Sequence, residues 1–299
     1  MEKYTIQIKR NLLPGFISAL SLDAKPTDEQ FVLRYYETAE FTLKIYDNTK
    51  HDYLNAVVTG TLPPYLKMYY EVKKKAEPQA TVAEPIHQYP QIGSDETGFG
   101  DFFGPVVVVS ALVRKEDLAK VKSYRITDSK KLSDSYILSI GPFLINEFKH
   151  VKNIVRNEKL NELIHKGYNM NKIKAMLHVN VLTLLGQREN ETLLLLDRFV
   201  AEDTFAGYVK ELPQVDIIHV ANGEANALSI ALASVIARYY FLTEIAALNK
   251  QFRTEIPLGA GEKVDEFARE FLTFHGPSAL KKIIKCNFKN FKRIFPTDV

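Results

Sequence analysis

Residues 91–113 read QIGSDETGFGDFFGPVVVVSALV, and this stretch gives the clearest indication of the fold. Residues 91–95 are typical of a short β-strand that leads into Gly98 and Gly100. Residues 105–113 are so rich in β-branched and apolar side chains that we expect a strand buried on both faces. The glycines between the two strands allow the backbone to turn or bend there.

Strands and helices alternate along the rest of the chain. Apolar runs predict strands over residues 151–155, 191–199 and 215–220, and helical periodicity predicts helices over residues 133–148, 171–188 and 224–249. Strands that come first in a run and then alternate with helices imply a mixed sheet covered by helices. The sequence therefore predicts an α/β fold for residues 91–299.

The first 90 residues follow a different pattern. Phe, Leu and Ile alternate with other residues over 41–46, which places them on one face of a strand. Residues 71–90 carry three consecutive lysines and three prolines without a sustained period, as expected of a linker stiffened by proline. We therefore predict a small α+β domain over residues 1–75, a proline-containing linker over 76–90 and a larger domain over 91–299.

The composition is that of a soluble globular protein. Apolar residues make up 46% and charged residues 25% of the 299 positions, which excludes a disordered or low-complexity chain. The formal net charge of +3 does not by itself indicate a nucleic acid or membrane partner. Cys286 is the single cysteine, which excludes an internal disulfide framework and a multi-cysteine metal site. Because no uninterrupted apolar run approaches the roughly 18 residues of a membrane span, we expect a cytoplasmic protein without a membrane partner.

Four acidic residues occupy positions where burial would be costly. Asp95 and Glu96 end the first strand, Asp197 follows four leucines, and Glu224 begins a strongly apolar helix. Crowded carboxylates repel one another unless they share a cation, and oxygen ligands without clustered Cys or His favour Mg²⁺ or Mn²⁺. Structural alternatives exist, since Asp197 could form a turn or cap a helix and Glu224 could favour the helix dipole. Neighbours on a regular strand point to opposite faces, so Asp95 and Glu96 can share one site only if the strand ends or bends there.

Five motifs, in order, resemble those of bacterial ribonuclease HIII, a relative of ribonuclease HII. The first two are GSDETGFGDFFGP over residues 93–105 and DSKKL over residues 128–132. The others are Tyr168-Asn169 followed by KAMLH over 174–178, LDRF over 196–199, and Glu224 followed by ASVIAR over 233–238. Five ordered matches over residues 91–241 make a specific signal, whereas a single match would not.

This resemblance implies a fold, an activity and a set of site residues. The fold is a ribonuclease H-like mixed sheet flanked by helices, with a small N-terminal α+β domain that binds substrate and resembles TATA-box-binding protein. The activity is that of an endonuclease that hydrolyses the RNA strand of an RNA–DNA hybrid. The implied catalytic residues, which would hold two Mg²⁺ or Mn²⁺ ions, are Asp95, Glu96, Asp197 and Glu224. The implied substrate-binding residues are Gly98, Phe99 and Gly100, which would contact the ribose through the backbone, and Ser129 and Lys130, which would contact phosphates.

Two positions depart from the family pattern. Asn222 and Gly223 stand where Lys-Ala generally precedes the fourth acid, so a basic group near the phosphates would be missing. Phe99 replaces a small polar residue, a change that backbone recognition of the ribose would tolerate. Asn222 could instead cap the helix that begins at Glu224.

The C-terminal residues 281–295 contain six basic residues and no acid. Phe288, Phe291 and Phe295 recur at helical spacing and predict the docked face of a helix, whose lysines either bind phosphates or are merely solvated.

We expect no catalytic role for His178, which lies within a motif, and we expect a monomer. Two alternative functions stay open. One is incision at single ribonucleotides in DNA, as in ribonuclease HII, and the other is binding of hybrids without catalysis.

Overall fold

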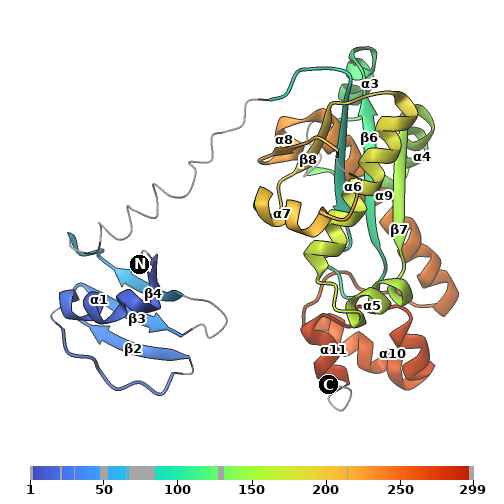
Figure 1. Ribbon diagram of the computed structural model, residues 1–299. Helices are drawn as coiled ribbons and strands as arrows, with labels where there is room; N and C mark the ends of the chain where they lie inside the picture. Colours follow the sequence, from blue (N-terminus) through green and yellow to red (C-terminus); the bar gives the residue numbers. More distant parts are fainter. Residues whose placement is uncertain are drawn as a thin grey trace. The chain divides into compact units, whose positions relative to one another are not determined.

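The structure, a computed structural model, describes residues 3–20, 22–29, 31–47, 53–64, 66, 85–126, 131–213 and 215–295. The chain forms two compact units that divide between Thr81 and Val82 (Figure 1). Ile86 already belongs to the second unit, because its amide donates to the carbonyl of Asn226 (2.7 Å). Residues 76–84 of the expected linker lie outside the described residues, so the expected boundaries at 75 and 90 remain predictions.

The N-terminal unit contains an antiparallel sheet and an α-helix. Its strand order is β1-β4-β3-β2. The alternation over residues 41–46 forms β3 as predicted, and Phe41, Leu43 and Ile45 are buried in a core that Phe16 and Leu20 of α1 complete. The bounds are β1 Lys3–Lys9, a 3₁₀ helix Arg10–Leu12, α1 Leu13–Leu20, β2 Val32–Glu37, β3 Phe41–Tyr46 and β4 Tyr53–Gly60.

The C-terminal unit is built on a five-stranded mixed sheet of order β7-β6-β5-β8-β9 (Figure 1). β5 runs antiparallel to β6 and parallel to β8, and β8 runs parallel to β9. The predicted α/β fold with a mixed sheet is confirmed. The bounds are β5 Gln91–Thr97, β6 Val106–Val113, β7 His150–Val155, β8 Leu194–Asp197 and β9 Ile217–Val220.

Helices cover both faces of this sheet. On one face α9 and α4 pack against Val107 and Val109 of β6, and on the other face α6 packs against Leu112. All residues of β6 are therefore buried, as predicted. The helices are α3 Leu118–Ser123, α4 Asp134–Glu147, α5 Asn157–His165, α6 Met170–Glu189, α7 Glu202–Val209, α8 Gly223–Asn226, α9 Leu228–Phe252, α10 Glu262–Lys281 and α11 Lys289–Ile294, with a 3₁₀ helix at Lys115–Asp117.

Helix α9 is long and apolar enough to cross a membrane by length and composition alone. Its most apolar window has a mean hydropathy of 1.4, and 56% of that window is buried inside the protein. The helix packs against the central strands β5 and β6. This packing accounts for its apolar character as that of a core helix.

One predicted helix is interrupted and another is confirmed. The helix expected over residues 224–249 is divided at Ala227, whose extended backbone (φ −142°, ψ 116°) separates α8 from α9. The helix expected at Phe288, Phe291 and Phe295 is α11, whose N-cap is Phe288 and whose C-cap is Phe295. The three phenylalanines pack into or against the apolar cluster of the C-terminal helices. The helix and its docked apolar face were therefore predicted correctly.

Candidate metal centre and nucleic-acid interface

Three of the four predicted acids lie at one end of the sheet, on or shortly after three neighbouring strands. Asp95 lies in β5, and the residue before it, Ser94, pairs with Leu196 of β8. Asp197 is the next residue of β8, so parallel pairing brings it alongside Asp95. Glu224 comes shortly after β9, in the first turn of α8. The sheet topology thus brings three segments that are distant in sequence to one end of the sheet.

Asp95 is a buried carboxyl group among other acids. The residue is only 7% exposed. Burial, together with the charges of Glu96 and Glu224, raises the pKa of Asp95 well above its usual value, and hydrogen bonds from Ser234 and the Glu96 amide oppose the shift only in part. An ionised carboxylate in such surroundings is unfavourable, and a divalent cation would remove the conflict.

Glu96 faces the other side of the sheet. β5 remains paired with β6 through Thr97, so it neither ends nor bends at the two acids. Asp95 lies opposite Val109, which faces α9, whereas Glu96 lies opposite Val108 and reaches α6. The side chains of Asp95 and Glu96 therefore point to opposite faces of the sheet, as on any regular strand.

Two basic residues of α6 neutralise Glu96. Lys174 forms an ion pair with Oε1, and Nε2 of His178 lies 2.9 Å from Oε2. Burial alone would raise the pKa of Glu96, but the hydrogen bonds and charges of His178 and Lys174 lower it to about 2. Sequence reasoning gave neither residue a part in the site. The signal that could have pointed to them is the KAMLH motif at 174–178, to which both belong.

His178 connects Glu96 to the residue before Asp95. It is fully buried, and its Nδ1 lies 2.7 Å from Ser94 Oγ, which itself donates to the carbonyl of Val109 (2.8 Å). Because the hydroxyl proton is already used, Nδ1–H donates to Oγ. His178 is thereby held in position by contacts at both ring nitrogens, one to Ser94 and one to Glu96.

Asp197 holds the start of the helix that carries Glu224. Its Oδ1 accepts a hydrogen bond from the amide of Gly223 (2.6 Å), the first residue of α8. The expectation that Asn222 caps this helix was wrong in one respect. Asn222 occupies the N-cap position with φ 51°, but its side chain makes no capping hydrogen bond. Asp197 therefore has a structural role in addition to any role as a ligand.

These acids do not form a closed cage. Within the described ranges, no group of three or more His, Cys, Asp or Glu side chains is arranged to hold a metal ion. The donors nevertheless suit a hard cation, because they are carboxylate oxygens and because the pKa of Asp95 is raised by burial and by neighbouring acids. Asp95, Asp197 and Glu224 lie at one end of the sheet, with Glu96 on the opposite face of β5.

The glycine segment, residues 98–104, follows β5 directly. Gly98 has φ +92°, and a Cβ at this position would lie 2.3 Å from the carbonyl oxygen of Pro105. Gly100 is exposed and has open space around it. The Phe99 side chain packs against an apolar cluster formed by β6, α5 and α6. The backbone around Gly100, rather than the Phe99 side chain, is therefore what this segment offers to a ligand.

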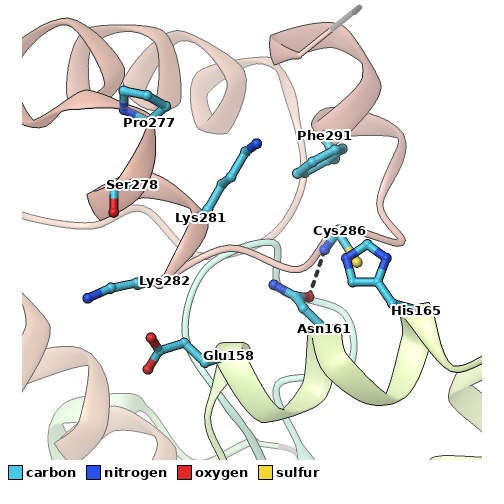
Figure 2. A pocket seen from close by; sticks show the side chains of 9 residues that line it. All are labelled: Glu158, Asn161, His165, Pro277, Ser278, Lys281, Lys282, Cys286 and Phe291. Carbon is cyan, nitrogen blue, oxygen red and sulfur yellow. Dashed lines mark hydrogen bonds between the residues drawn. The ribbon is translucent and has the colours of Figure 1, made fainter. Parts of the chain in front are cut away.

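Lys285 anchors the glycine segment from the C-terminal side, and sequence reasoning placed this residue on the surface instead. It is fully buried, and burial lowers its pKa to about 7. Its ammonium donates to three backbone carbonyls of the segment, those of Asp101 (2.7 Å), Phe103 (3.2 Å) and Gly104 (2.6 Å). Asn161 of α5 holds the neighbouring backbone, accepting from the Cys286 amide (3.0 Å, Figure 2) and donating to the Ile284 carbonyl (2.9 Å).

The predicted phosphate-binding residues lie in two parts of the chain. Ser129 and Lys130 lie outside the described residues and remain predictions. Among the C-terminal cations, Arg293 pairs with Asp265 (2.6 Å), whereas Lys289 and Lys292 are exposed on α11. Exposed lysines of this stretch are therefore available to a polyanion.

A pocket of about 630 Å³ lies between α5 and the C-terminal helices (Figure 2). Lys281 and Lys282 line it from the end of α10, and Glu158 and His165 line it from α5. Because an acid faces the lysines, the pocket is mixed in charge and does not select for an anion.

Three comparisons with known proteins agree with one another. The family model described as Ribonuclease HII matches residues 92–291. Ribonuclease HIII of Phytoplasma mali is 38% identical over 211 residues, covering 69% of this chain and 73% of the relative. That of Bacillus thuringiensis is 35% identical over 211 residues, covering 68% of each chain.

Among solved structures, Bst-RNase HIII in complex with Mn²⁺ has a TM-score of 0.68 at 26% identity, covering 99% of this chain and 98% of that one. Ribonuclease H3 of Aquifex aeolicus shares the fold, with a TM-score of 0.57 at 21% identity over 95% of this chain and 100% of that one.

Proposed function

Because the chain belongs to the ribonuclease HII family and is a ribonuclease of that class, we propose that it hydrolyses the RNA strand of RNA–DNA hybrids with two bound divalent cations. The observation that carries the proposal is Asp95, a buried carboxyl group whose pKa is raised by burial and by the charges of Glu96 and Glu224. Such crowding is costly in an ordinary core but suits a site that binds cations. The Mn²⁺ in the similar Bst-RNase HIII structure supports this view.

The cations would be held by the four predicted acids. Asp95, Asp197 and Glu224 would supply carboxylate oxygens from one end of the sheet, and Glu96 would contribute from the opposite face of β5. When bound, the cations would activate a water molecule and stabilise the leaving 3′ oxygen. The chain itself keeps the ligands in place, because strand pairing fixes Asp95 and the hydrogen bond from Gly223 to Asp197 fixes the helix of Glu224.

Selection of RNA would depend on the glycine segment. The 2′-hydroxyl is present only in RNA and can both donate and accept a hydrogen bond. Gly100 leaves the backbone open at its position, and Lys285 holds three carbonyls of the segment. Backbone groups of residues 98–100 would contact the ribose. Ser129, Lys130 and the N-terminal domain would bind the duplex without reading its bases.

One assay tests the proposal against both alternatives. A labelled hybrid and a DNA duplex with one embedded ribonucleotide are incubated with Mg²⁺, Mn²⁺ or a chelator. We expect cleavage of the continuous hybrid that the chelator abolishes. Incision at the lone ribonucleotide would indicate the activity of ribonuclease HII, and binding without cleavage would indicate a silent protein. An Asp197→Asn variant that cleaves normally would remove Asp197 from the proposed site.

A further inference from the structure

The ammonium group of Lys174 lies beside Glu96 and two aromatic rings. The Lys174 side chain is 14% exposed and pairs with Oε1 of Glu96. Its Nζ also lies 4.2 Å from the ring centre of Phe199 and 5.8 Å from that of Phe99. Phe199 follows Asp197 by two residues, and Phe99 belongs to the glycine segment. The cation is thus close to Glu96 and to the side chain of Phe99 in the glycine segment.

A divalent cation at Glu96 would compete with the present partners of this carboxylate. Its two oxygens contact Lys174 and His178. His178 is fully buried and held at its other nitrogen by Ser94, so it has little freedom to move. Lys174 has a flexible four-carbon stem and a partly exposed head group. Lys174 is therefore the partner that can be displaced.

The two phenylalanine rings would keep the displaced ammonium at the site. A cation within about 6 Å of an aromatic ring centre is attracted to the ring face, and both distances meet this criterion. Phe199 is itself supported by the ring of His178, with the two ring centres 5.8 Å apart. An ammonium held in this way, and without its carboxylate, is a site for an incoming anion.

We propose that Lys174 binds a phosphate of the RNA strand, next to the ribose contacted by the glycine segment, once a divalent cation has displaced it from Glu96. This inference rests on the proposed function. Without the cation, Lys174 neutralises Glu96, and with the cation bound, the same charge serves the substrate. The family pattern has a lysine before the fourth acid, where this chain has Asn222. Lys174 would supply the basic group near the phosphates that this change removes.

The test compares Lys174→Met, which removes the charge, and Lys174→Arg, which keeps it, with Lys172→Met as a matched control. Lys172 lies on the same helix with its Nζ 4.7 Å from the ring centre of Tyr168, away from Glu96. Mn²⁺ affinity is measured by calorimetry on the protein without nucleic acid. Hybrid affinity is measured in saturating Mn²⁺ at several salt concentrations, in an Asp197→Asn background, which we expect to prevent cleavage. Lys174→Gln replaces the Met variant if that variant does not fold.

The two affinities of Lys174→Met are expected to move in opposite directions. Loss of a competing ion pair should tighten Mn²⁺ binding by roughly three- to fivefold. Loss of one phosphate contact should weaken hybrid binding by roughly five- to tenfold and reduce the salt slope by about 0.7 to 0.9. Lys174→Arg should restore most of the hybrid affinity, and Lys172→Met should change neither.

If Lys174 had a purely structural role, Lys174→Met would bind both Mn²⁺ and the hybrid more weakly, and that result would overturn the proposal. So would an unchanged hybrid affinity and salt slope. Failure of the unaltered protein to cleave hybrids would instead overturn the proposed function, while the two binding comparisons would still decide whether Lys174 contacts phosphate.

Discussion

A methyl group at Gly98 would lie 2.3 Å from the carbonyl oxygen of Pro105, in a residue whose φ of +92° already disfavours a side chain. We expect Gly98→Ala to lower the free energy of unfolding by about 1 to 3 kcal/mol. A methyl group at Gly100 would meet nothing within 4 Å beyond its chain neighbours, so Gly100→Ala should change this free energy by less than about 0.5 kcal/mol. Urea unfolding measures both variants, and equal losses would contradict this account.

Lys285 should make stability depend on pH in a defined direction. Burial lowers its pKa to about 7 from an ordinary value of 10.5. Between these values the unfolded chain binds a proton that the folded chain has released, so the contribution of Lys285 to the free energy of unfolding rises with pH. Lys285→Met lacks this contribution. The stability of the unaltered protein relative to the variant should therefore increase between about pH 6 and about pH 9 in urea unfolding, whereas a decrease would contradict the lowered pKa.

At the scale of elements, the four-residue helix α8 depends on Asp197, because the Asp197 carboxylate accepts the amide of its first residue. Asp197→Asn keeps an oxygen acceptor and should change the free energy of unfolding by less than about 0.5 kcal/mol. Asp197→Ala removes the acceptor and should cost about 1 to 2 kcal/mol, as for a lost helix cap. Calorimetry should show weakened Mn²⁺ binding in both variants. Equal destabilisation would mean that the charge of Asp197, rather than its hydrogen bond, holds α8.

Elements with a strong local pattern could be predicted from the sequence. The valines of β6 reflect burial of both faces of that strand, and the alternation in β3 reflects burial of one face. The local sequence alone reveals both patterns. The break at Ala227 could not be predicted, because neither Gly nor Pro stands at Ala227 or next to it. The buried Lys285 also escaped prediction, since lysine is rarely buried and its carbonyl partners lie far away in sequence.

In the candidate site too, residues within sequence motifs could be predicted, whereas contacts that depend on tertiary packing could not. Asp95 and Asp197 could be named from the motifs, and the parallel pairing of β5 with β8 brings them alongside each other. The partners of Glu96 could not be named, because they depend on which face of the sheet α6 covers. Ser129 and Lys130 remain predictions, since they lie outside the described residues.

At the scale of the whole molecule, the net charge of +3 conceals how positive charge is distributed over the C-terminal unit. Lys289 and Lys292 are exposed on α11, whereas Lys285 is buried and Arg293 is paired with Asp265. A phosphate backbone could therefore be bound by Lys289 and Lys292 but not by every basic residue of the stretch. The salt dependence of binding counts such contacts directly.

Reversing the charge of Lys289 and Lys292 together should reduce the slope of log affinity against log salt by about 1.4 to 1.8 if each contacts one phosphate. The matched control reverses Lys115 and Lys122, two exposed lysines that follow the end of β6. Because β6 runs antiparallel to β5, these control residues lie at the opposite end of the sheet from Asp95 and Asp197. Hybrid binding at several salt concentrations should show the reduced slope only in the α11 variant. An unchanged slope would mean that these lysines are merely solvated, and an equal reduction in both variants would mean that only the overall charge matters.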